Sequence, residues 1–263
     1  MYKLIVTDLD NTLLDERGEV PEATLKVCRA LAEKKVEIAV ATGRSYASAK
    51  AIAERIHSQM PMICYNGAEI VDQEGTSLYA SNVSRDVQEE VVDFVLDRGL
   101  YLQVYDQGEI VVEKLDLKAH PDPDLKYASY RETHSLRALG KIKTPKLLIA
   151  GPPEKIPGLQ RELEKKLGDK VYIAQSEAHL IEIMDKEANK GRALKLLADK
   201  MGLAREDVMA LGDNTNDILL LQAAGLGVAV GNGVKDLKAI ADYICEHDRS
   251  YGFNEAVERF IGL

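Results

Sequence analysis

The chain has 263 residues and a net charge of −9, with 46% hydrophobic and 29% charged residues, a composition that excludes an intrinsically disordered protein. Its three cysteines form no C-x-x-C pair, which excludes a disulfide framework and a cysteine-based zinc site. The acidic balance argues against a general binder of nucleic acid or anionic membranes. The apolar run before Asp8 is too short for a signal peptide, and no run approaches the roughly 18 residues of a membrane-spanning helix. We therefore expect a cytoplasmic protein and predict no nucleic-acid, membrane or protein partner.

Apolar strand candidates alternate with helical patterns at the start of the chain. Residues 4–6, 37–40 and 61–65 are the strand candidates. Polar residues follow them at Asp8, at Thr42-Gly43 and at Asn66-Gly67. Apolar residues recur at helical spacing between these runs. The pattern predicts β-α-β units.

The middle of the chain has a different pattern. A helix is predicted after Ser84, and residues 100–105 and 109–113 indicate a hairpin. A strand over 146–150, a helix bearing Leu159, Leu163 and Leu167, and strands over 171–174 and 180–184 complete the segment. These units predict an α+β domain with an antiparallel sheet, with boundaries near Asn82 and Lys186.

The last part returns to the first pattern. A helix is predicted from Lys190 to a stop at Gly202, and strands are predicted over 208–211 and 227–230. Apolar strands separated by amphipathic helices indicate a parallel sheet covered on both faces. We therefore predict an α/β fold whose core spans residues 1–82 and 186–263, with residues 83–185 inserted as an α+β domain.

Polar residues gather at the predicted carboxyl ends of the core strands, where open α/β sheets bind ligands. We expect one crevice to collect Asp8, Asp10, Thr42, Lys190, Asp213, Asn216 and Asp217. Clustered carboxylates with all-oxygen ligands select Mg²⁺ or a similar hard cation. A lysine, a hydroxyl and backbone N–H groups beside the metal fit a phosphate.

Three other features of the sequence have interpretations of their own. Asp8 and Glu19 match the ends of a calcium-binding EF-hand loop, but Leu13 stands where that loop needs glycine. The glycines of residues 225–231 straddle a strand rather than follow one, which excludes a dinucleotide loop. Arg44 is interpreted either as an anion ligand or as a solvent-facing side chain.

Four ordered motifs resemble those of the haloacid dehalogenase superfamily. They are Asp8-Leu9-Asp10-Asn11-Thr12-Leu13-Leu14, Ala41-Thr42-Gly43-Arg44, Asn189-Lys190-Gly191 and Gly212-Asp213-Asn214-Thr215-Asn216-Asp217. The chain is similar to the Cof-type sugar-phosphatase branch, which carries a type IIB cap domain between the second and third motifs. Asn66-Gly67-Ala68 and Gly231-Asn232 also match that branch. Two positions depart from the pattern: Asn11 stands where the family often has glycine, and Leu220 where methionine is common.

The resemblance implies a Rossmann-like core and a Mg²⁺-dependent phosphatase that hydrolyses small phosphomonoesters through an aspartyl-phosphate. It implies that Asp8 is the nucleophile and that Asp10 is the general acid and base. It implies metal binding by Asp8, the Asp10 backbone carbonyl, Asp213 and, through water, Asp217. It further implies phosphate binding by the Leu9 backbone, Thr42, Gly43, Lys190 and Asn216. A phosphomutase, a non-catalytic phosphate-sensing module and a receiver-type signalling domain remain as alternatives, although the intact Asp8 and Asp10 and the inserted domain argue against the last two.

Overall fold

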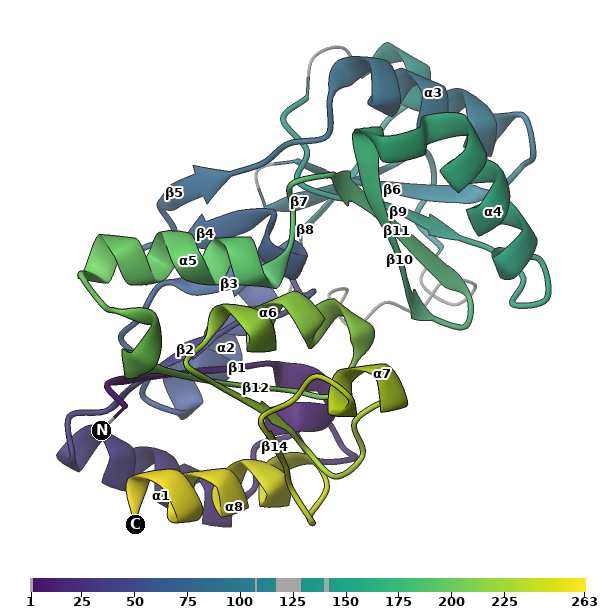
Figure 1. Ribbon diagram of the computed structural model, residues 1–263. Helices are drawn as coiled ribbons and strands as arrows, with labels where there is room; N and C mark the ends of the chain where they lie inside the picture. Colours follow the sequence, from purple (N-terminus) through teal and green to yellow (C-terminus); the bar gives the residue numbers. More distant parts are fainter. Residues whose placement is uncertain (1, 107, 117–128, 140–141) are drawn as a thin grey trace. The chain divides into compact units, whose positions relative to one another are not determined.

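The computed structural model describes residues 2–106, 108–116, 129–139 and 142–263. The chain divides into two compact units, and the first is made of residues 1–79 and 189–263 while the second is residues 80–188. Figure 1 shows the elements of both units. In the described ranges, no helix combines the length and the apolar character needed to cross a membrane.

A five-stranded parallel sheet forms the centre of the first unit, in the order β14-β13-β12-β1-β2. Its strands are β1 (Leu4–Thr7), β2 (Glu37–Val40), β12 (Val208–Gly212), β13 (Leu226–Ala229) and β14 (Tyr243–Ile244). Helices cover both faces, as the apolar strands predict (Figure 1). They are α1 (Glu22–Glu33), α2 (Tyr46–Arg55), α5 (Lys190–Met201), α6 (Ile218–Ala223), α7 (Lys235–Lys238) and α8 (Arg249–Ile261).

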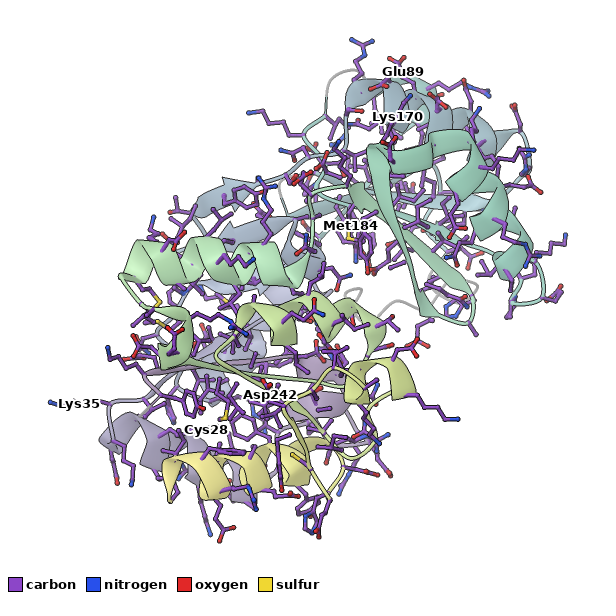
Figure 2. The ribbon with its side chains drawn as sticks, in the orientation of Figure 1. Cys28, Lys35, Glu89, Lys170, Met184 and Asp242 are labelled. Atoms are coloured by element: carbon purple, nitrogen blue, oxygen red, sulfur yellow. The ribbon has the colours of Figure 1, made fainter. Side chains whose placement is uncertain are left out.

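Successive side chains of β1 point to opposite faces of the sheet, so both faces pack against helices. Leu4 and Val6 pack in one cluster with Leu194 and Leu197 of α5 and with Leu221 of α6. Side chains on the other face are equally buried, including Cys28 of α1, whereas Lys35 beyond that helix extends into solvent (Figure 2). At the sheet's edge, the Asp242 carboxylate accepts a hydrogen bond from the Gly227 N–H at 2.8 Å, which joins the start of β14 to β13 (Figure 2).

The third predicted strand lies outside the parallel sheet. The strand β3 (Met62–Cys64) pairs antiparallel with β4 (Glu69–Val71), and β5 (Ser77–Ala80) completes this three-stranded sheet. A single parallel bridge from Ala41 to Ile63 joins it to the end of β2. The 3₁₀ turn η2 (Tyr65–Gly67), in which every residue has a positive φ, reverses the chain and so produces the antiparallel pairing.

A six-stranded sheet forms the second unit, in the order β10-β11-β9-β6-β7-β8. Its strands are β6 (Tyr101–Asp106), β7 (Glu109–Val112), β8 (Ser129–Glu132), β9 (Leu147–Ala150), β10 (Val171–Glu177) and β11 (Leu180–Asp185). All pairs are antiparallel except β7 with β8, and the predicted hairpin is the β6–β7 pair. The helices α3 (Arg85–Leu96) and α4 (Ile156–Leu167) pack against one face through Val87, Val91 and Leu163. The mixed α/β fold class predicted from the sequence is confirmed.

Short helical turns connect these elements. The segment η1 (Leu9–Leu13) follows β1, and η7 (Thr215–Asp217) precedes α6. The remaining turns among the described residues are η4 (Leu136–Ala138), η5 (Gly168–Lys170) and η6 (Arg205–Asp207). The helix α5 stops at Gly202 as predicted, and Gly202 adopts a left-handed conformation. The turns η1 and η7 both lie at the carboxyl end of the parallel sheet, where the polar motifs are found.

Candidate active site

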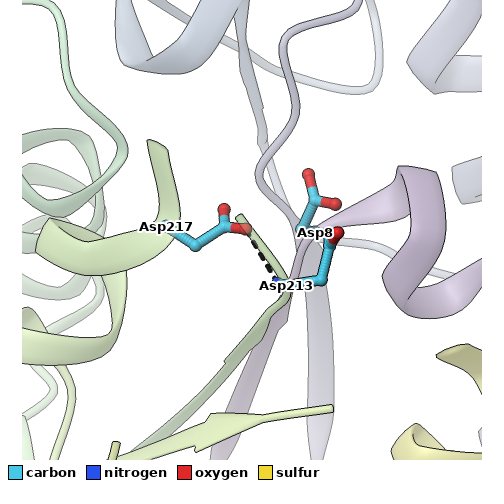
Figure 3. A group of neighbouring side chains, drawn as sticks. All are labelled: Asp8, Asp213 and Asp217. Carbon is cyan, nitrogen blue, oxygen red and sulfur yellow. Dashed lines mark hydrogen bonds between the residues drawn. The ribbon is translucent and has the colours of Figure 1, made fainter. Parts of the chain in front are cut away.

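Two neighbouring strands bring the first and last acidic motifs together. Because β1 and β12 are parallel, with Thr7 opposite Leu211, the residues that follow them leave the same edge of the sheet. The Asp8 N–H donates to the Leu211 carbonyl at 3.0 Å, which extends this pairing by one residue. Asp8 and Asp213 are 6% and 7% exposed. Figure 3 shows their carboxylates and that of Asp217 converging at this point.

Backbone N–H groups fix the Asp217 carboxylate. Its Oδ2 accepts a hydrogen bond from the Asp213 N–H at 3.0 Å, drawn in Figure 3, and one from the Asn214 N–H at 3.1 Å. The residue is fully buried. Gly212 makes this fold-back possible, since a Cβ on it would lie 2.4 Å from the Asp217 Cβ. The Asp213 carboxylate is oriented by the first motif, because the Thr12 hydroxyl donates to Asp213 Oδ1 at 3.0 Å.

Lys190 lies between two of these acids. It begins α5, it is fully buried, and its Nζ lies 2.6 Å from both Asp8 Oδ1 and Asp217 Oδ1. Two glycines permit its close approach. A Cβ on Gly191 would lie 2.1 Å from the Leu219 carbonyl oxygen, and one on Gly67 would lie 2.3 Å from that of Asn189. The start of α5 is therefore seated by backbone contacts that only glycine allows.

The electrostatics of this cluster are unfavourable without a further cation. Burial raises the pKa of Asp8 well above its ordinary value; Lys190 opposes the rise, and Asp217 and Asp213 add to it. Burial, with Asp217, also raises the pKa of Asp213 to about 6. Burial alone would lower the pKa of Lys190, but Asp217 and Asp8 outweigh it, and the pKa is raised.

The donor set fits a divalent cation. Oxygens of Asp8, Asp213 and Asp217 lie within 4.8 Å of one another. With all groups ionised, Lys190 compensates one of the three negative charges and leaves two. Carboxylate oxygens are the ligands of hard cations such as Mg²⁺. The site can therefore hold a metal ion that carries the missing positive charge.

A second polar group follows β2. The fully buried Thr42 accepts a hydrogen bond from the Arg44 N–H at its hydroxyl, at 3.2 Å, and one from the Asn66 N–H at its carbonyl, at 2.9 Å. Asn66 Oδ1 accepts from Asn216 Nδ2 at 2.9 Å. The side chain of Asn66 also lies 3.2 Å from where a Cβ on Gly43 would be. Three of the residues predicted to bind phosphate, Thr42, Gly43 and Asn216, thus surround Asn66.

The loop after β1 holds the remaining predicted residues. The Leu9 side chain is buried, and its carbonyl accepts from the Leu14 N–H at 2.9 Å. Asn11 has φ 59°, a left-handed conformation that asparagine tolerates better than most residues, and this explains why it can replace the glycine common in the family. Asp10 directs its carboxylate to Arg44, with Oδ2 accepting from Nε at 2.8 Å and Oδ1 from Nη2 at 2.5 Å. Its side chain thus lies outside the trio of acids that can share a cation.

Sequence reasoning assigned no site role to Thr12 or Asn66 and left that of Arg44 open. A signal existed for each, because all three lie within or beside the matched motifs. Nothing in the spacing of residues shows which side chain each one meets. Leu220, which stands where the family commonly has methionine, is a buried core side chain packed with α5 and leaves the reacting groups unchanged.

A parallel sheet with acidic residues and a buried lysine at its carboxyl edge is typical of α/β proteins that bind their ligands at the ends of the strands. The sequence profile of the haloacid dehalogenase-like hydrolases matches residues 5–257. The chain therefore belongs to this family and is a hydrolase.

Relatives and solved structures agree with this assignment. The HMP-PP phosphatase of Serratia proteamaculans is 32% identical over 91% of this chain and 88% of its own. Phosphatase YwpJ of Bacillus subtilis is 29% identical over 95% of this chain and 96% of its own. The crystal structure of a haloacid dehalogenase-like hydrolase from Bacteroides thetaiotaomicron has a TM-score of 0.88 at 29% identity, covering 98% of this chain and 99% of that one. The predicted membership is confirmed, and both of these relatives are phosphatases.

Proposed function

We propose that the protein hydrolyses small phosphomonoesters, such as sugar phosphates, with Mg²⁺ and through a phosphoryl group carried by Asp8. The observation that carries the proposal is the environment of the Asp8 carboxylate. It follows a central strand and lies 2.6 Å from the ammonium of Lys190, within the buried acidic trio. A carboxylate placed beside fixed positive charge is suited to attack phosphorus.

The acidic trio is the proposed metal site. Asp8, Asp213 and Asp217 supply the carboxylate oxygens, and the backbone carbonyl of Asp10 is predicted to join them. Bound there, Mg²⁺ would offset the negative charge on the transferring phosphoryl oxygens. Lys190, whose Nζ lies 2.6 Å from Asp8 Oδ1 and Asp217 Oδ1, supplies further positive charge beside both acids.

The proposed reaction has two displacements. Asp8 attacks phosphorus and takes the phosphoryl group, while Asp10 gives a proton to the departing ester oxygen and releases an alcohol. Water then attacks the same phosphorus, Asp10 takes a proton from it, and inorganic phosphate leaves as Asp8 is restored. The Leu9 backbone, Thr42, Gly43 and Asn216 are proposed to hold the phosphoryl oxygens.

We further propose that an inserted domain over about residues 83–185 discriminates among substrates. It has its own core around α3 and α4, and it separates the second and third motifs in the sequence. A cytoplasmic location and the predicted lack of nucleic-acid, membrane and protein partners remain predictions from composition.

The experiment is a phosphate-release assay on 4-nitrophenyl phosphate and a panel of sugar phosphates, with chelator and with added Mg²⁺. Asp8→Asn should lower turnover by several orders of magnitude, since it removes the attacking charge. The matched control is Asp207→Asn, because Asp207 precedes β12 at the amino edge of the same sheet and pairs with Lys3. Full activity in chelator, or in Asp8→Asn, contradicts the proposal. Phosphoryl return to substrate that requires a bisphosphate identifies a phosphomutase, and binding without turnover identifies a sensing module.

A further inference from the structure

We propose that Arg44 is the positioning residue for Asp10: it fixes the direction of the carboxyl group that exchanges protons with the leaving group and with water. This inference rests on the proposed function and adds a residue to which the sequence motifs gave no definite role. The geometry that carries it is a two-point contact. Nε and Nη2 of Arg44 each donate to a different oxygen of Asp10, at 2.8 and 2.5 Å.

The Asp10 carboxyl needs such a contact. Its side chain is 49% exposed, and it belongs to a stretch where the backbone leaves helical geometry, with ψ 127° at Asp10 and φ 59° at Asn11. An exposed aspartate samples several staggered rotamers. Within the described part of the chain, both hydrogen bonds of this carboxylate come from Arg44. A planar guanidinium that binds both oxygens fixes the rotation of the carboxyl plane as well as its position.

Arg44 is itself held in place. Its side chain is 12% exposed, and its Nη1 donates to the Ser48 hydroxyl at 3.3 Å. Its N–H donates to the Thr42 hydroxyl at 3.2 Å, and its carbonyl accepts from the Tyr65 N–H at 3.1 Å. Asp10 is therefore aligned from the segment that connects β2 to α2, which also carries Thr42.

Two other roles for Arg44 fit less well. A half-exposed ion pair adds little to folding stability, so the pair is poorly explained as a structural support. A role only as a direct ligand for the substrate's phosphate leaves unexplained the two donors of Arg44 that bind the two oxygens of Asp10. Positioning accounts for both contacts.

The test compares kcat/KM for phenyl phosphate and 4-nitrophenyl phosphate, which differ in the basicity of the departing phenolate. This constant reports the steps through departure of the leaving group, and a general acid matters more when that group is more basic. Arg44→Met should lower kcat/KM for phenyl phosphate by about tenfold while 4-nitrophenyl phosphate changes by less than about twofold. Arg44→Lys, which offers one ammonium, should stay closer to Arg44→Met than to the wild type.

Two controls make the result specific. Arg55→Met removes the ion pair between Arg55, at the end of α2, and Glu19, and should leave both constants unchanged. In an Asp10→Asn background, Arg44→Met should change kcat/KM for phenyl phosphate by less than about twofold, because the group it positions is no longer an acid.

Three results would overturn the positioning role. The first is an equal loss of kcat/KM for both esters in Arg44→Met, and the second is a wild-type kcat/KM in Arg44→Lys. The third is a double variant of Arg44→Met and Asp10→Asn whose loss of kcat/KM is the product of the two single losses. Failure of the proposed function looks different: Asp8→Asn would then turn over both esters normally, whatever Arg44→Met does.

Discussion

Replacing Asp213 by asparagine should stabilise the metal-free protein at neutral pH while reducing its activity. The variant keeps the side chain's size and the oxygen that accepts from Thr12, but it removes one of three crowded negative charges. The pKa of Asp213 is about 6 in the folded protein, against an ordinary value of 3.8. The difference is about 2 pKa units, or about 3 kcal/mol.

The sign of this effect follows from the raised pKa. The folded protein binds the Asp213 proton more tightly than the unfolded chain does, so the associated stability is present below pH 3.8 and is lost as the pH rises through about 6. Asparagine does not titrate. Asp213→Asn should therefore match the wild type in unfolding free energy near pH 4 and exceed it by up to about 3 kcal/mol at pH 7.5 in chelator.

Urea unfolding in chelator, followed over this pH range and repeated with Mg²⁺, measures the effect. A ligand at 100 times its dissociation constant stabilises by about 2.7 kcal/mol, and Mg²⁺ should stabilise the wild type more than the variant, which has lost a charged ligand. Asp207→Asn is the control with the opposite sign, because Lys3 holds the pKa of Asp207 below its ordinary value. A variant less stable than the wild type in chelator at pH 7.5 would refute the electrostatic reasoning.

Two further predictions concern the support of the site and the inserted domain. Gly191→Ala should cost about 1–3 kcal/mol of stability and lower activity, because its Cβ would meet the Leu219 carbonyl oxygen and displace the start of α5. The control is Gly158→Ala in α4, where nothing lies within 4 Å of the added Cβ, and this variant should be neutral or stabilising. Equal urea midpoints for the two variants would contradict this prediction. Replacing residues 83–185 by a short Gly-Ser linker should leave slow hydrolysis of 4-nitrophenyl phosphate and remove discrimination among sugar phosphates; a folded variant with an unchanged substrate ranking would show that the inserted segment does not set specificity.

The convergence of Asp8, Asp213 and Asp217 could be expected from the sequence because topology determines it, whereas Lys190 begins α5 and follows no strand of the parallel sheet. Residues that follow parallel strands leave the same edge of the sheet, whatever their side chains do. The pairing of Asp10 with Arg44 could not, because it depends on the side-chain rotamers of two residues in separate segments, one after β1 and one after β2. Likewise, the sequence placed Thr42 and Asn216 at this edge but could not show that Asn66 lies between them.

The fold was predictable where strands are apolar and buried. Leu4–Thr7 and Leu147–Ala150 are continuous buried runs, and both were expected. The edge strand β8, Ser129–Glu132, is mostly exposed and polar, and β14 has two residues, so neither has an apolar pattern to detect. The reversal after Cys64 depends on positive φ angles at Tyr65 and Asn66. Asparagine commonly adopts such an angle but tyrosine rarely does, so the residue types indicate the reversal only at Asn66.

The most direct test of the central claim is to trap the phosphoryl group on Asp8. Asp10→Asn preserves the acidic trio and the backbone of the loop but removes the group that activates water for the second displacement. Rapid mixing of this variant with 4-nitrophenyl phosphate and Mg²⁺ should give a burst of phenolate approaching one per enzyme, followed by a slow steady state. Mass spectrometry of the quenched protein should then find the phosphoryl group on Asp8. A variant that turns over without a burst, with no phosphorylated Asp8, would contradict the assignment of the nucleophile and of the two displacements.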